Sequence, residues 1–222
     1  MKLIFGTLSF LLLPAAACPA APVSISAGIL NTRGEPFISH RGTGPFDTTL
    51  ALNVPYEPVR LARGQIADSL NIYLDYFKGW DPRGEAHVTV ITPVEYWEAL
   101  RHNISIEEIE IIAQVNHIQN SDLKVLGVGS GKAMLDGKEE ETFFFIVASA
   151  NLRNIRKHIY RKFLENGGRP EAFSPEMFYP HITIGYTRRD LHIQDGVIKD
   201  MEHSNDTRFE VTKKGASLLL IP

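Results

Sequence analysis

The chain has 222 residues, of which 44% are hydrophobic and 22% charged, and its formal net charge is −3. This composition is ordinary for a globular protein, and the length is enough to bury a sizeable core. A duplex nucleic acid is held largely by cationic side chains, so the slightly negative charge argues against duplex DNA as a partner.

The first 17 residues have the features of a signal peptide. Lys2 provides the positive start, residues 3–13 form a short apolar core, Pro14 interrupts it, and residues 15–17 offer a small-residue cleavage site. The apolar stretch is shorter than the roughly 20 residues of a membrane span. We therefore expect a secreted or periplasmic protein, with a short membrane anchor or a lipoprotein anchor on Cys18 as alternatives.

Residues 18–46 are rich in Pro, Gly, Ser and Thr and lack periodicity, which predicts an irregular leader. The folded domain is expected over residues 47–222. Its first elements are a strand over 48–54, indicated by alternating polarity, and a helix over 60–77, indicated by helical apolar spacing. A strand rich in β-branched residues follows at 87–91.

Capping boxes at Thr92 and Ser105 predict the starts of two further helices, and Asn151 is expected to cap a third. Strands are predicted between and after these helices, at residues 123–128, 142–149, 181–186, 209–211 and 217–221. Because strands and helices are mixed and several strand pairs are hairpin-like, the sequence predicts an α+β fold. The similar strands at 87–91 and 181–186 suggest two lobes that share a cleft.

The Gly-rich stretch over residues 127–133 is similar to a phosphate-binding loop, but Leu126 stands at the position of the first Gly and Ala133 at that of the Ser/Thr. We therefore predict a flexible hairpin turn here. Lys132 could reach a substrate phosphate from such a turn.

A His-x-Thr pattern with apolar residues at the alternate positions occurs twice, as HVTV from His87 to Val90 and as HITI from His181 to Ile184. Side chains alternate across a strand, so the His and Thr of each copy point to one face and the apolar pair points to the other. Two such strands would present two imidazoles and two hydroxyls to one groove.

This set of side chains suits displacement at phosphorus. The reaction needs a base for the nucleophile and an acid for the leaving oxygen, and histidine can do either near neutral pH. Threonine hydroxyls can donate hydrogen bonds to the non-bridging oxygens.

The two segments resemble the paired motifs of the 2H phosphoesterase superfamily, and the resemblance extends from about residue 48 to the C-terminus. It implies a bilobal fold, with two antiparallel sheets around a central cleft and flanking helices. It also implies metal-independent hydrolysis of a cyclic phosphate, as in RNA 2′,3′-cyclic phosphodiesterases. The substrate would be a small cyclic phosphate or a short single-stranded RNA end, and no cofactor is expected.

By the same resemblance, His87 and His181 would be the acid–base pair, and Thr89 and Thr183 would hold the phosphate. Tyr179 and Tyr186 flank the second motif and could contact the substrate or pack in the core. If strict alternation continues along this strand, Tyr186 falls on the core face.

Two other interpretations remain open. A metallohydrolase built on the two motif histidines would need a third ligand, which the motif does not supply, so we expect no metal. A non-catalytic module could bind a phosphorylated ligand or a glycan in the same cleft. We expect a monomer.

Overall fold

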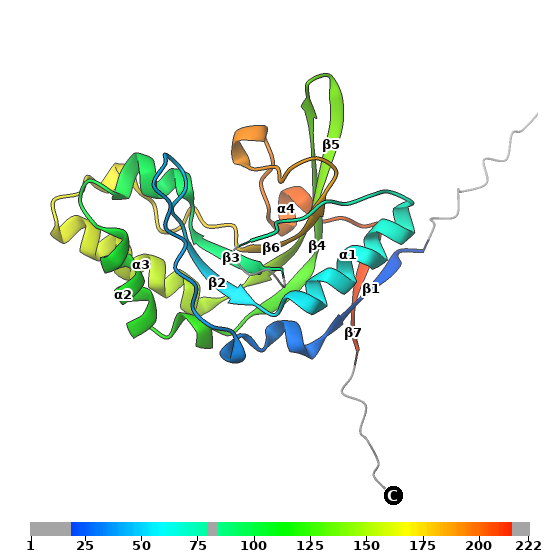
Figure 1. The fold of residues 1–222 in the computed structure, drawn as a ribbon, viewed down its shortest axis with the longest axis horizontal. Helices are drawn as coiled ribbons and strands as arrows, with labels where there is room; N and C mark the ends of the chain where they lie inside the picture. Colours follow the sequence, from blue (N-terminus) through cyan, green and yellow to red (C-terminus); the bar gives the residue numbers. More distant parts are fainter. Residues whose placement is uncertain (1–18, 80–83, 215–222) are drawn as a thin grey trace, which may run out of the picture.

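The computed structural model describes residues 19–79 and 84–214 (Figure 1). The predicted signal peptide, Cys18 and the last predicted strand lie outside the described residues. None of the helices within the described ranges is long and apolar enough to cross a membrane.

The described chain forms a mixed α/β structure with two sheets. The larger sheet is antiparallel and has the strand order β2-β3-β6-β5-β4. Its strands are β2 (Leu50–Val54), β3 (Ala86–Ile91), β4 (Lys124–Leu135), β5 (Lys138–Ala148) and β6 (His181–Tyr186). The smaller sheet pairs β1 (Ala21–Ser26) with β7 (Phe209–Lys214) in parallel.

This arrangement corrects two expectations. The sheets of the described chain are one antiparallel and one parallel, rather than two antiparallel sheets, because β3 and β6 pair with each other inside a single sheet. In the segment 18–46, expected to be irregular, residues Ala21–Ser26 form a strand because β7 supplies a partner from the far end of the chain.

The helices are α1 (Tyr56–Leu70), α2 (Ile106–Val115), α3 (Ala150–Glu165) and α4 (Met201–Ser204), with a π-helical segment at Glu95–Leu100. Short 3-10 turns lie at Ala27–Leu30, Thr32–Gly34, Ile118–Asn120, Pro170–Ala172 and Ile193–Asp195. In Figure 1, α2 and α3 lie side by side at one end of the molecule, and β1 runs along α1.

The helix starts test the capping predictions. Ser105 forms the predicted capping box with Glu108, and Thr92 exchanges hydrogen bonds with Glu95, so both are confirmed. The prediction for α3 is wrong by two residues, because Ser149 accepts from the backbone N–H of Leu152 and caps the helix.

Helix α1 is shifted toward the N-terminus relative to the range 60–77 that its apolar spacing predicts. It begins at Tyr56 and ends at Leu70, where Asn71 adopts the left-handed conformation with φ 52°. Such a residue ends a helix because the chain can no longer continue the α-helical hydrogen bonds.

The Gly-rich stretch 127–133 is not a turn but the middle of β4, which corrects the hairpin-turn prediction. The glycines are needed for close packing, since a Cβ on Gly129 would lie 2.4 Å from the ring of Phe144. The turn between β4 and β5 lies instead at Asp136 and Gly137, which have φ 49° and 81°. Positive φ at both positions is typical of a tight two-residue hairpin turn.

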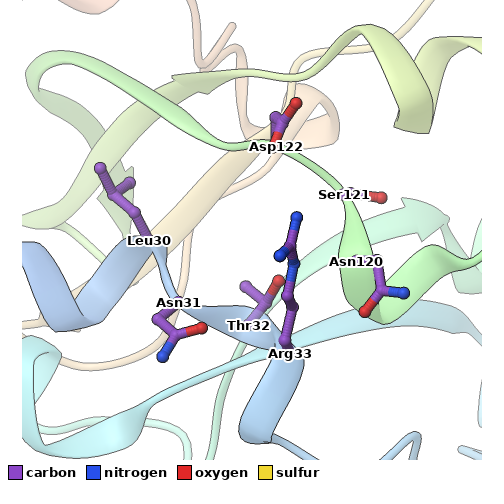
Figure 2. A pocket seen from close by; sticks show the side chains of 7 residues that line it. All are labelled: Leu30, Asn31, Thr32, Arg33, Asn120, Ser121 and Asp122. Carbon is purple, nitrogen blue, oxygen red and sulfur yellow. The ribbon is translucent and has the colours of Figure 1, made fainter.

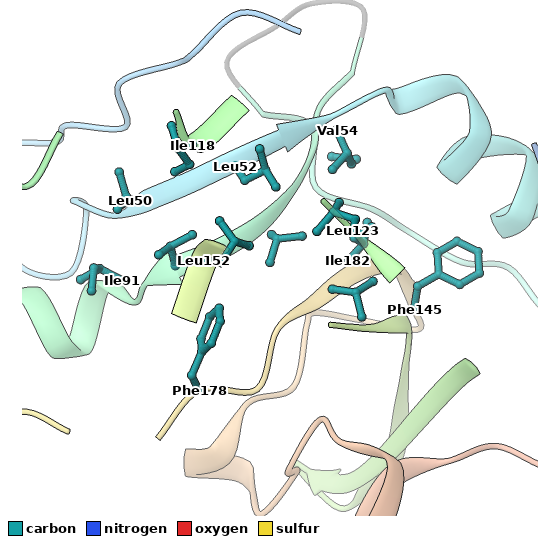
Figure 3. Close-up of a cluster of buried hydrophobic side chains, with 14 of the residues drawn as sticks. Leu50, Leu52, Val54, Ile91, Ile118, Leu123, Phe145, Leu152, Phe178 and Ile182 are labelled. Carbon is teal, nitrogen blue, oxygen red and sulfur yellow. The ribbon is translucent and has the colours of Figure 1, made fainter. Parts of the chain in front are cut away.

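One face of the large sheet carries the main hydrophobic core. Side chains from β2, β3, β5 and β6 pack there against α1, α2 and α3. Figure 3 shows part of this cluster, including Leu52, Leu152 and Ile182. Because the helices cover this face, the polar residues of the alternating strands are directed to the opposite face.

Candidate active site

The two motif strands are neighbours in the sheet. Val88 of β3 lies opposite Ile182 of β6, and both side chains are fully buried in the main core. Residues opposite each other in an antiparallel pair point to the same face, and their immediate neighbours point to the other. All four motif side chains therefore share the face away from the helices; they are His87, Thr89, His181 and Thr183, each partly exposed.

The register also sets how the two imidazoles are spaced. In an antiparallel pair centred on Val88 and Ile182, His87 stands opposite Thr183, so His87 and His181 are diagonal neighbours. Diagonal neighbours of this kind are typically about 7–8 Å apart, within reach of long side chains.

His181 is held by hydrogen bonds at both ring nitrogens. Its Nδ1 lies 2.7 Å from the carbonyl oxygen of Tyr179, and its Nε2 lies 3.2 Å from Nζ of Lys199. A carbonyl oxygen only accepts, so Nδ1 carries the ring hydrogen. Nε2 is then the unprotonated nitrogen and accepts from the Lys199 ammonium.

Lys199 and Asp190 form an ion pair beside this ring. Nζ of Lys199 donates to both carboxylate oxygens of Asp190, at 2.7 and 2.8 Å. The same carboxylate accepts from the hydroxyls of Thr142, at 2.6 Å, and Thr183, at 2.9 Å. One motif hydroxyl is thus already bound to a protein anion.

The pKa values of His181, Lys199 and Asp190 are all shifted from their ordinary values. Burial, followed by the Lys199 charge, lowers the pKa of His181 to about 3. Burial also lowers the pKa of Lys199. Burial alone would raise the pKa of Asp190, but Lys199, His192 and His181 outweigh it and hold the pKa of that carboxyl well below its usual range. His181 is therefore neutral at physiological pH beside a buried ion pair.

His87 has a different partner. Its Nδ1 lies 3.0 Å from Oε1 of Glu85, and the same oxygen lies 2.7 Å from Nε2 of His40. A carboxylate accepts, so Nδ1 of His87 carries a hydrogen. Phe77 packs edge-on against the His87 ring, with the centroids 5.2 Å apart. His40 and Glu85 are buried, whereas the His87 side chain is 22% exposed.

His40, Glu85 and His87 each offer one ligand atom, and these atoms lie within 4.8 Å of one another. Two imidazoles and a carboxylate form a donor set that zinc accepts. His40 and Glu85 thus supply the ligands that the motif itself lacks, so the motif alone does not exclude a metal at this group. In the structure the same donors are joined to one another by the hydrogen bonds described above.

A β-bulge decides where Tyr186 lies. Phe143 pairs with Gly185 but Phe144 pairs with Thr183, so Ile184 has no partner in β5. Beyond the bulge Tyr186 stands opposite Thr142, whose hydroxyl reaches Asp190. Tyr186 therefore lies on the histidine face, and the core-face position expected from strict alternation is wrong. Burial raises the pKa of its hydroxyl.

Of the other two candidate substrate contacts, Tyr179 lies next to a motif histidine and Lys132 does not. Tyr179 orients His181 through its carbonyl oxygen, and its side chain is half-buried. Lys132 is paired with Glu139 at 2.7 Å. It also lines a surface pocket of about 520 Å³ together with Val197, His203 and other residues, none of which belongs to a motif. The structure therefore does not bring Lys132 to the motif histidines.

A second pocket, of about 230 Å³, lies between the 3-10 turn after β1 and the segment before β4 (Figure 2). Figure 2 shows Arg33, Thr32 and Asp122 among its lining residues. It contains no motif residue either, so neither of these two pockets holds the motif histidines.

Two His-x-Thr strands side by side in an antiparallel sheet are the feature of a two-histidine phosphoesterase. The model of the family described as "Swiss Army Knife, 2H phosphoesterase domain" matches residues 50–192, more than half of the chain, so the protein belongs to the 2H phosphoesterase superfamily. Membership implies a hydrolase that acts on phosphodiester bonds. No curated protein and no solved structure matches the chain.

Sequence reasoning missed four residues of this site. Glu85 could have been found, because it lies two residues before His87 and alternation puts it on the same face. His40, Asp190 and Lys199 come from segments without a regular pattern, and only the folded chain brings them to the motif strands.

Proposed function

We propose that the protein hydrolyses a cyclic phosphodiester by acid–base catalysis between His181 and His87, without a metal. The observation that supports this proposal is the sheet face shared by the two imidazoles, which follows from the register of β3 and β6. A 2′,3′-cyclic nucleotide, free or at the end of a short single-stranded RNA, is the substrate class. We also propose that the protein acts as a monomer after export.

The hydrogen bonds support distinct roles for the two rings. Nε2 of His181 carries no hydrogen of its own, so His181 is the base that takes a proton from the attacking water. His87 holds its Nδ1 hydrogen on the Glu85 carboxylate, which fixes the orientation of its ring. With His181 as the base, His87 is the acid that gives its Nε2 proton to the leaving oxygen.

The test is an assay of the purified protein with nucleoside 2′,3′-cyclic phosphates in the presence of EDTA. We expect turnover in the chelator, and a loss of about 10²-fold or more in His87→Ala and in His181→Ala, the usual contribution of an acid or base. His102→Ala is the matched control, because His102 is exposed and outside the site.

Complete loss of activity in EDTA, restored by added zinc, would reject the metal-free mechanism and point to the ligands around His87. Binding of a cyclic nucleotide without any product over hours would favour a non-catalytic binding module instead.

A further inference from the structure

The ammonium of Lys199 is the cationic group nearest to the proposed base. The side chain is 3% exposed, and its three N–H groups are matched by three acceptors: both oxygens of Asp190 and Nε2 of His181. Two of these bonds are to an anion and are short. The third, at 3.2 Å to a neutral ring nitrogen, is the longest of the three.

The bond between Lys199 and His181 occupies the atom that the reaction needs. Nε2 of His181 is the nitrogen that would accept the proton of the attacking water, and in the free protein it accepts from Nζ instead. Burial and the Lys199 charge also hold the pKa of His181 to about 3, far below the range in which a ring is an effective base near neutral pH. The substrate must therefore change this contact.

The second motif lacks its expected phosphate donor. Thr183 has a single hydroxyl hydrogen, and it donates that hydrogen to Oδ2 of Asp190 at 2.9 Å. A carboxylate does not donate, so Thr183 cannot at the same time donate to a phosphate oxygen. Beside this strand, the N–H of Lys199 that points at His181 is the donor left for a non-bridging oxygen.

We propose that Lys199 is a phosphate-binding catalytic residue, whose ammonium moves one N–H from Nε2 of His181 to a non-bridging phosphate oxygen when a phosphodiester binds. This proposal rests on the proposed function. Asp190 keeps the other two N–H groups and holds the ammonium in place. Nε2 is then free to take a proton from water as the water oxygen bonds to phosphorus. The ester bond to the leaving oxygen breaks, and that oxygen takes its proton from His87.

The surroundings of Lys199 suit this movement. The ring of Phe144 lies 5.1 Å from Nζ and contacts His181 edge-on, so the aromatic face stabilises the ammonium over the site. The anionic substrate would offset the Lys199 charge felt by His181, and the remaining charged or titratable neighbours of that ring are Asp190 and His192. Binding of the anion should therefore raise the pKa of the base when it is needed.

Lys199 also lies beyond residue 192, where the family match ends. The part of the segment between β6 and α4 that carries Lys199, residues 193–200, thus lies outside the matched range.

The test compares three variants by kinetics and by phosphate binding. Lys199→Met alone leaves the Asp190 carboxylate without its counter-ion, so the informative variant is Lys199→Met/Asp190→Asn, which removes both charges. We expect the double variant to keep a cooperative thermal transition but to lose about 10²-fold or more in kcat, the usual cost of removing a charged transition-state donor. Lys132→Met is the matched control, since that lysine is exposed and paired elsewhere.

Inorganic phosphate is the second probe, read by NMR of the His181 ring nitrogens. In the wild-type protein, saturating phosphate should shift the Nε2 resonance and raise the His181 pKa by at least one unit; in the double variant, phosphate affinity should fall at least tenfold. A double variant within threefold of wild-type kcat, or a wild-type Nε2 resonance that phosphate leaves unchanged, would overturn the role of Lys199. If no cyclic phosphate is turned over yet the Nε2 resonance responds to phosphate through Lys199, the proposed function fails and the binding role stands.

Discussion

Phe144 packs edge-on against His181, with ring centroids 5.7 Å apart and an interplanar angle of 69°. The position of this ring depends on Gly129 in the neighbouring strand, where a Cβ would lie 2.4 Å from the Phe144 ring. The glycines of β4 thus help to set the place of a motif histidine two strands away.

Gly129→Ala should therefore lower both stability and activity. Overpacking of this kind costs about 1–3 kcal/mol, and the displaced Phe144 ring would push on His181. Thermal unfolding and turnover of a cyclic nucleotide measure the two effects. Gly64→Ala is the control, because Gly64 lies inside α1 and a Cβ added there would meet nothing within 4 Å. It should stabilise the protein by about 0.5–1 kcal/mol. Equal melting temperatures for the two variants would contradict the packing effect.

Thr183→Val and Thr142→Val should have similar effects, because both hydroxyls donate to the Asp190 carboxylate. Each loss should cost about 1–3 kcal/mol in unfolding free energy, the penalty of weakening a partly buried hydrogen bond to a charged group. KM should stay within about threefold of wild type in both, since neither hydrogen is free for a phosphate. A tenfold rise in KM for Thr183→Val alone would restore the phosphate-binding role that the motif implies for Thr183.

The stability of the protein should fall as the solution is acidified below pH 6.5. Unfolded His181 takes up a proton near the ordinary histidine pKa of 6.5, whereas the pKa of folded His181 is lowered to about 3. Between these values the unfolded state binds one more proton, so each pH unit of acidification costs up to about 1.4 kcal/mol. Urea unfolding at pH 4 to 8 measures the slope, which should be shallower in His181→Gln. Identical slopes would show that His181 titrates normally in the folded protein.

His40 should act on the reaction through Glu85, as a positioning residue. His40→Leu removes the hydrogen bond at 2.7 Å that fixes the Glu85 carboxylate against His87. We expect kcat to fall about tenfold, less than the loss of an acid or base itself. His40→Gln can still donate to Glu85 and should recover most of the rate. If His40→Gln loses as much activity as His40→Leu, His40 supports only packing.

The sequence predicts the motif strands well because their pattern is local. Alternation puts His87 and Thr89 on one face, and the β-branched residues between them predict the strand. Whether His87 shares a sheet face with His181 depends on the register between β3 and β6, which the local sequence pattern does not determine. For the same reason, the local pattern does not show that both motif strands belong to one antiparallel sheet rather than to two.

Other features could not be predicted because they arise from packing between distant segments. The bulge at Ile184 moves Tyr186 to the opposite face of the sheet from the one that alternation predicts. It is seen only as a register shift between β6 and β5. The glycines of β4 predict a turn by composition, yet they are explained by Phe144 and Val197 on other parts of the chain. Lys199 lies in an irregular segment, where a lone lysine indicates nothing until its partners are known.

The pairing of β1 with β7 gives the protein a late folding step. Ser24 and Thr212 are 188 positions apart, yet their side-chain oxygens lie 3.1 Å from each other. Contacts over such long loops form slowly, and β1 cannot pair until nearly the whole domain has been made. A nascent chain that stops before Phe209 would leave the edge of β1 unpaired, and such an edge is a template for joining another unfinished copy.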